Sequence, residues 1–238
     1  MGYPKYQINF MPEAYYGYCS TACFMGILNY FWYTQFNMKD TRDVMKIAKM
    51  GRYTKDSWLD EVEMWYALSR LWFQVTYATS WTRENELAYI NDPVWYMTKK
   101  YENFAHKEFL SEDWTRKNSA WWRSFNIYDT IPTKQILESD EIEKLYEIDL
   151  VSIVKKYQND DTLFILPLNW YALYDQNPQE WISGWHVVLC KGYENWMFEI
   201  YDPGPYKKPD FIPEKRVMAA MQYLFPEYDF IMVKNNVL

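Results

Sequence analysis

A nucleophile and its base can be drawn from very few residues of this sequence, because it contains three cysteines and two histidines. Cys19 stands at the predicted start of a helix, where unpaired backbone N–H groups and the helix dipole favour a thiolate over a thiol. His186 opens the apolar segment HVVLC, which predicts a strand that could hold the imidazole at the mouth of a cleft. A thiolate within reach of a histidine base can attack a carbonyl group and form an acyl-enzyme.

A carboxylate that could orient this histidine follows the next predicted strand. Asp202 ends the segment MFEIYD, sixteen residues after His186, and a hairpin through Gly192 to Asn195 would bring it back beside the imidazole. A carboxylate in that place fixes the tautomer of the ring. The other residues of these types are interpreted as structural, with two buried in the core and one on a helix surface: Cys23, Cys190 and His106.

Two stretches of the chain resemble C39-like cysteine peptidases, which are papain-like enzymes. The stretch YCSTACFMGILNYF looks like their nucleophile helix, and GWHVVLCKGYENWMFEIYDPG looks like the strand pair that carries their histidine and acid. The order Cys, His, Asp, with 167 positions between the first two (186 minus 19), is similar to the papain-like order and unlike the transglutaminase-like one. The resemblance covers about residues 7 to 80 and 160 to 238, and it implies a peptidase triad of Cys19, His186 and Asp202.

The oxyanion hole departs from the pattern of that family. The family has a glutamine about six residues before the cysteine, whereas this chain has Glu13, a carboxylate that can only accept hydrogen bonds. Gln7 is the candidate donor in its place, together with the backbone N–H of Cys19.

On the substrate side, we expect three residues beside His186 to line the cleft: Asn169, Trp170 and Trp185. The segment LPLNWYAL interrupts an apolar strand with a polar and a large aromatic residue, which suggests a functional role. The alternative for Asn169 and Trp170 is the end of a strand followed by a capped turn.

The elements that must position these residues are predicted from periodicity and capping signals. Helices are expected at 19–32, from Asp40 or Thr41 to Gly51, and from about 56 to 71, followed by a strand at 73–79. Residues 82 to about 160, including the acidic stretch 138–149, are predicted to be almost wholly helical. Strands at 162–168, 185–193, 197–202 and 229–233 and a helix at 213–224 complete the chain.

This order predicts an α+β class. The resemblance implies a papain-like fold, with an N-terminal helical half whose nucleophile helix packs on a C-terminal antiparallel sheet. We expect one domain, 1–238, with a helical insertion at about 82–160. The tryptophans of the insertion are predicted to pack beside the cleft and narrow it: Trp95, Trp114, Trp121 and Trp122.

Charge and hydropathy argue against several other classes of protein. The formal net charge is −7 without a basic stripe, which disfavours a nucleic-acid partner. No apolar run approaches the roughly 18 residues of a membrane span, and MGYPKYQINF is unlike a secretory signal, so we expect a cytoplasmic protein without membrane contact. A closed zinc site is not indicated, because the cysteines and histidines lack the short paired spacings of zinc ligands. An EF-hand is not indicated either, because the acidic stretch 138–149 lacks the glycine at which such a calcium loop turns. No metal or cofactor is expected.

The sequence therefore predicts a cysteine peptidase or other amide hydrolase that acts on a peptide or amide substrate through an acyl-enzyme on Cys19. Two alternatives stay open. The same triad could pass the acyl group to an amine, as in an acyltransferase or transpeptidase. A catalytically inactive papain-like protein could instead only bind its ligand, and Glu13 favours that alternative.

Overall fold

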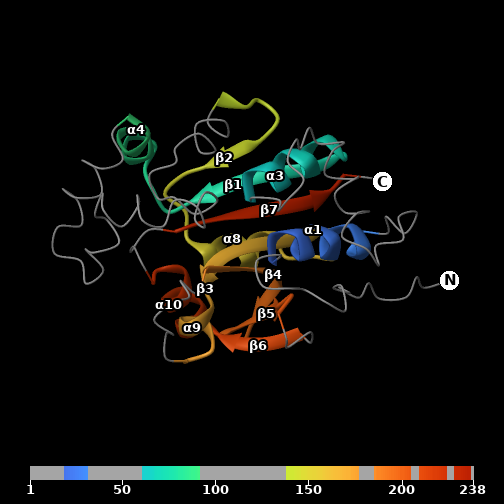
Figure 1. Cartoon of the computed structure of the whole chain (residues 1–238), viewed down its shortest axis with the longest axis vertical. Helices are drawn as coiled ribbons and strands as arrows, with labels where there is room; N and C mark the ends of the chain where they lie inside the picture. Colours follow the sequence, from blue (N-terminus) through green and yellow to red (C-terminus); the bar gives the residue numbers. More distant parts are fainter. Residues whose placement is uncertain are drawn as a thin grey trace, which may run out of the picture. The chain divides into compact units, whose positions relative to one another are not determined.

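The computed structural model describes residues 19–31, 61–91, 138–176, 185–204, 209–223 and 228–236. The chain divides into two compact units, one formed by Met1–Ser80 with Glu141–Leu238 and the other by Trp81–Asp140. The first unit holds a mixed α/β structure in which helices pack on one sheet (Figure 1). The described part of the second unit contains helix α4 (Arg83–Asn91), which begins after Thr82, whose Oγ1 accepts from the Asn85 N–H.

The described residues form a seven-stranded sheet in the order β2-β1-β7-β3-β4-β5-β6. Its strands are β1 (Phe73–Thr79), β2 (Glu143–Leu145), β3 (Thr162–Asn169), β4 (Trp185–Glu194), β5 (Met197–Tyr201), β6 (Pro209–Pro213) and β7 (Asp229–Asn235). Neighbours are antiparallel except for β1 and β2, which are parallel. Because β4 is paired on both sides, by β3 and β5, its backbone is firmly placed.

One face of the sheet is covered by α8 (Leu150–Tyr157), α9 (Trp170–Leu173) and α10 (Glu214–Met221). Alternate strand residues meet these helices in one core, among them Phe164, Val188, Cys190 and Phe230, as the period of two in a strand requires. These four side chains are fully buried.

The other face is covered by α1 (Cys19–Tyr30), which contacts β4, and by α3 (Glu61–Arg70), which contacts β1 (Figure 1). The rings of Trp65 and Tyr77 lie 5.9 Å apart, which ties α3 to β1. Residues 22–28 of α1 are all buried, so this helix is apolar on every side and packs as a central helix. A helix enclosed in this way gives its first residue a fixed position against β4.

Several sequence predictions are confirmed in this unit. The strand at 73–79 and the helix within 56–71 are present, and so are the strands that begin at 162, 185, 197 and 229 and the helix within 213–224. The mixed helix and strand content agrees with the prediction. The expected helix at 42–50 and residues 92–137 of the insertion lie outside the described residues.

Three expectations differ from the structure. The acidic stretch 138–149 is not a helix face but contains β2, because Ile142 is buried and Glu143–Leu145 pairs with β1. Residues 141–157 therefore belong to the sheet unit, and the second compact unit ends at Asp140. The sheet is not purely antiparallel, since β2 runs parallel to β1, and it gains an unpredicted edge strand, β6.

No helix among the described residues is long and apolar enough to cross a membrane. Within the same residues, no group of three or more His, Cys, Asp or Glu side chains is arranged so that it could hold a metal ion.

Candidate active site

Cys19 is the first residue of α1, so its side chain stands where the first backbone N–H groups of the helix have no partner within the helix. The residue as a whole is partly exposed. Burial alone would raise the pKa of Cys19, but a hydrogen bond and the charge of His186 outweigh it and lower the pKa below the ordinary value. Hydrogen bonds with the backbone of Val187 and Ser20 act in the same direction. The Cys19 thiol at the start of the helix therefore ionises more readily than an ordinary cysteine.

His186 is the second residue of β4, and it pairs with Leu168 of β3. Its side chain is 13% exposed, so the ring is held by protein and still reaches solvent. The Nε2 atom lies 2.6 Å from Oδ1 of Asp202. With Nε2 engaged in this way, Nδ1 is the ring nitrogen left for the hydrogen bond with the Cys19 thiol.

Asp202 reaches His186 because β4 and β5 form a hairpin. The hairpin turns at Asn195 and Trp196, slightly beyond the turn expected at 192–195, and β5 ends one residue before Asp202. The carboxylate is 1% exposed, and its Oδ1 also accepts from the Gly204 N–H at 2.6 Å. A Cβ on Gly204 would lie 2.9 Å from this oxygen, so the close turn requires glycine there.

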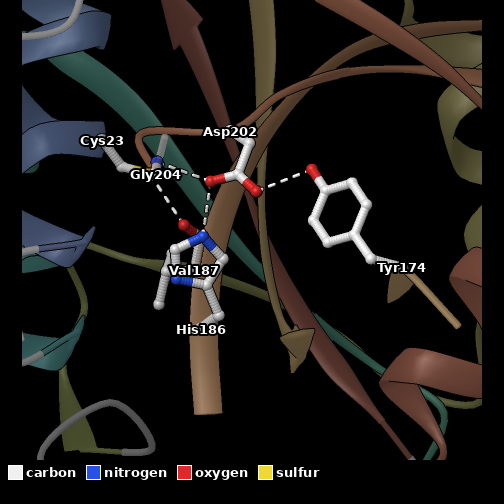
Figure 2. Close-up of polar contacts among 6 residues, drawn as sticks. All are labelled: Cys23, Tyr174, His186, Val187, Asp202 and Gly204. Carbon is white, nitrogen blue, oxygen red and sulfur yellow. Dashed lines mark hydrogen bonds and ion pairs between the residues drawn. The ribbon is translucent and has the colours of Figure 1, made fainter. Parts of the chain in front are cut away.

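The second carboxylate oxygen is held by Tyr174, whose hydroxyl donates to Oδ2 at 2.7 Å (Figure 2). Tyr174 is the C-cap residue of α9 and approaches the carboxylate from the side away from the imidazole (Figure 2). The sequence alone does not indicate this residue. The chain contains 23 tyrosines, and neither spacing nor neighbours distinguish this one.

Cys19, His186 and Asp202 shift one another's pKa values in the direction that favours the charged form of each. Burial by itself lowers the pKa of His186, yet its hydrogen bonds and charge interactions with Asp202 and Cys19 raise it to about 10. Burial likewise works against ionised Asp202, but His186, Tyr174 and Gly204 together hold the pKa of that carboxyl below its ordinary value. The group therefore favours a thiolate, an imidazolium and a carboxylate in one row.

Helix α1 is also tied to the strand that carries His186. Cys23 lies one turn after Cys19, and its Sγ donates to the Val187 carbonyl at 3.4 Å (Figure 2). Cys23 and Cys190 are fully buried, which confirms their interpretation as core residues, and none of the three cysteines forms a disulfide. The raised pKa of Cys190, to which burial contributes most, leaves it a poor nucleophile.

Of the residues expected on the substrate side, Asn169 lies on the strand next to His186, whereas Trp170 does not. Asn169 ends β3 opposite Trp185, but its Oδ1 accepts from the Ala172 N–H at 3.0 Å and caps α9. Trp170 is not on the strand; it is the first residue of α9. This is the capped turn given as the alternative, and a role in lining the cleft remains a prediction.

Three further positions have no described side chain. Trp185 begins β4, but its side chain lies outside the described residues. Gln7 and Glu13 also lie outside them, so the oxyanion donor proposed from the sequence stays a prediction.

The sequence matches no protein-family model, and a comparison with curated proteins finds no match either. A nucleophile at a helix start, an imidazole and a buried carboxylate joined in one chain of hydrogen bonds can take up and return a proton during attack on a carbonyl carbon.

Proposed function

We propose that this protein is a cysteine peptidase or related amide hydrolase with a papain-like fold of the C39-like kind. The observation that carries the proposal is the single imidazole of His186, bonded on one side to the thiol of Cys19 and on the other to the buried carboxylate of Asp202. The packing of α1 against β4 supports it, because α1 begins at Cys19 and β4 carries His186.

The reaction begins when the Cys19 thiolate attacks the carbonyl carbon of an amide and a C–S bond forms. The carbonyl oxygen becomes negative, and backbone N–H groups at the start of α1 can donate to it. His186, already protonated as the imidazolium, gives its Nδ1 proton to the leaving nitrogen as the C–N bond breaks. A thioester on Cys19 and a free amine result.

Water then completes the cycle. The neutral imidazole of His186 takes a proton from the water that attacks the thioester, and the C–S bond breaks to release a carboxylic acid and regenerate the thiolate. Throughout both steps Asp202 holds the ring in position and stabilises its charged form. An amine that replaces water in this step would give acyl transfer by the same residues.

Alkylation by iodoacetamide tests the ion pair without any knowledge of the substrate. At pH 6 a free thiol with a pKa of about 8.5 is less than about 1% thiolate. Cys19 is expected to react at least about tenfold faster than such a thiol, and His186→Ala is expected to remove this advantage because it removes the imidazolium. Peptide mass spectrometry would follow carbamidomethylation of each cysteine over time.

The buried cysteines provide an internal control for this experiment. Cys23 and Cys190 should stay unmodified in the folded chain and react only after denaturation, because both are fully buried. If Cys19 reacted at the same rate in His186→Ala as in the unaltered chain, the thiol would not be activated. The alternative of a protein that only binds its ligand would then be preferred.

Tyr174→Phe is expected to lower kcat by about tenfold, which corresponds to about 1.4 kcal/mol, with little change in KM. The loss of one charge-assisted hydrogen bond lets the Asp202 carboxylate turn and raises its pKa, so the imidazole is less firmly oriented. Steady-state kinetics on a cleaved peptide would measure this effect, with Tm recorded for both variants.

Tyr171→Phe is the matched control, since this ring belongs to the same short helix and packs on Trp170 at a centroid distance of 5.4 Å. Its kcat should stay within about twofold of the unaltered value. Equal losses in both variants would indicate a general loosening of α9 and would speak against a role for the Tyr174 hydroxyl.

A further inference from the structure

A second concave site lies where the β4–β5 hairpin turns beside the end of α8, separate from the proposed triad. It has a volume of about 490 Å³, opens to solvent, and is lined by Lys155, Gln158, Tyr193, Glu194, Asn195 and Trp196. His186 and Glu194 are eight positions apart on β4, which places the two sites roughly 25 Å apart at about 3.3 Å per residue.

Trp196 of this site has a backbone conformation that is unfavourable for tryptophan, and its large apolar side chain is exposed to solvent. Asn195 and Trp196 form the turn with φ of 51° and 64°, a conformation in which asparagine is well tolerated but glycine is favoured at the second place. Trp196 is also 73% exposed, so burial of its indole does not compensate for the strained backbone. Because Trp196 also lines the concave site, this conflict suggests that its side chain serves a ligand there.

The polar groups around this indole are held in position by the fold. Gln158 Oε1 accepts from the Tyr193 N–H at 2.6 Å, which fixes the orientation of its amide. A Cβ at Gly192 would lie 2.8 Å from the same oxygen, so glycine is what allows the approach. The Lys155 ammonium lies 4.7 Å from the centre of the Tyr193 ring and 5.8 Å from that of Trp196.

We propose that this pocket binds a neutral saccharide of one or two rings. An exposed indole offers a flat apolar surface to the C–H face of a pyranose, while amide, ammonium and carboxylate groups at its edge can bond hydroxyl groups as donors and acceptors. The volume falls in the range of small-molecule sites. One lysine beside one glutamate balances in charge, which favours a neutral ligand over a phosphate or sulfate.

The proposal is tested by NMR of the intact chain, following the indole and backbone N–H resonances during titration with a panel of neutral mono- and disaccharides. The resonance of Trp196 is identified by its absence in Trp196→Gly. We expect at least one member of the panel to shift it at millimolar concentration or below, and Trp196→Gly to weaken that binding at least tenfold. The Tm of Trp196→Gly should be unchanged or higher, because glycine adopts positive φ without strain.

Trp72→Gly is a closely matched control. Trp72 is 69% exposed with a φ of 70°, but it stands in the turn between α3 and β1 and does not line the pocket. This variant should bind the saccharide as tightly as the unaltered chain does. The proposal is overturned if no neutral saccharide shifts the Trp196 resonance, if Trp196→Gly retains full affinity, or if only peptides or sulfated sugars bind.

Discussion

Cys19→Ala is expected to abolish amide hydrolysis, with kcat falling by about 10⁴-fold or more, because the acyl-enzyme then has no sulfur on which to form. Cys19→Ser should retain almost no activity, since the imidazolium of His186 cannot keep a serine hydroxyl ionised as it does a thiol. Incubation with a peptide library, followed by mass spectrometry of new termini, would measure the cleavage and would at the same time reveal which bonds are cut.

Cys190→Ala is the control for this prediction, because it removes a thiol from the strand that carries His186 without altering the triad. Its turnover should stay within about twofold, although its stability should fall through the loss of a buried side chain. Cleavage by Cys19→Ala at an undiminished rate would remove the catalytic role from Cys19 and leave only the mixed α/β architecture.

The candidate triad could be predicted because each member stands at the end of an element that the sequence marks clearly. Cys19 precedes an apolar helix, His186 heads an apolar strand, and Asp202 follows the partner strand of a hairpin. In a hairpin, the start of the first strand and the end of the second lie side by side at the open end. The pairing of β4 with β5 therefore brings His186 and Asp202 together. Only the approach of α1 requires information from the tertiary structure.

Other features could not be predicted because tertiary contacts decide them. In the stretch 141–145 the spacing of acidic residues suits a helix, yet the parallel pairing with β1 holds it extended, helped by the Thr76 hydroxyl, which donates to Glu143 at 2.9 Å. Tyr174 meets Asp202 across 28 positions of sequence, and no local pattern reports such a contact. For Asn169, at the end of β3, the sequence allowed either a residue that lines the cleft or the cap of a turn. In the structure its side chain caps α9.

The pH dependence of turnover should report the ion pair directly. The pKa of Cys19 is lowered and that of His186 is raised to about 10, so thiolate and imidazolium coexist between the two values. Activity is expected to rise as pH increases through the lowered pKa of Cys19 and to stay level across neutral pH. It should then fall near pH 10, where His186 loses the proton that the leaving amine needs.

Asp202→Asn should shift the alkaline side of this profile and thereby identify the acid that supports His186. Asparagine keeps an oxygen that can accept from Nε2–H but carries no charge, so the imidazolium loses its anionic partner and its pKa falls. We expect the alkaline limb to move down by at least about one pH unit, or about 1.4 kcal/mol. Profiles from pH 4 to pH 11 on the best library peptide would measure the shift, with Asp210→Asn, an exposed carboxylate of β6, as control. An alkaline limb that stays in place in Asp202→Asn would mean that another group sets the protonation of His186.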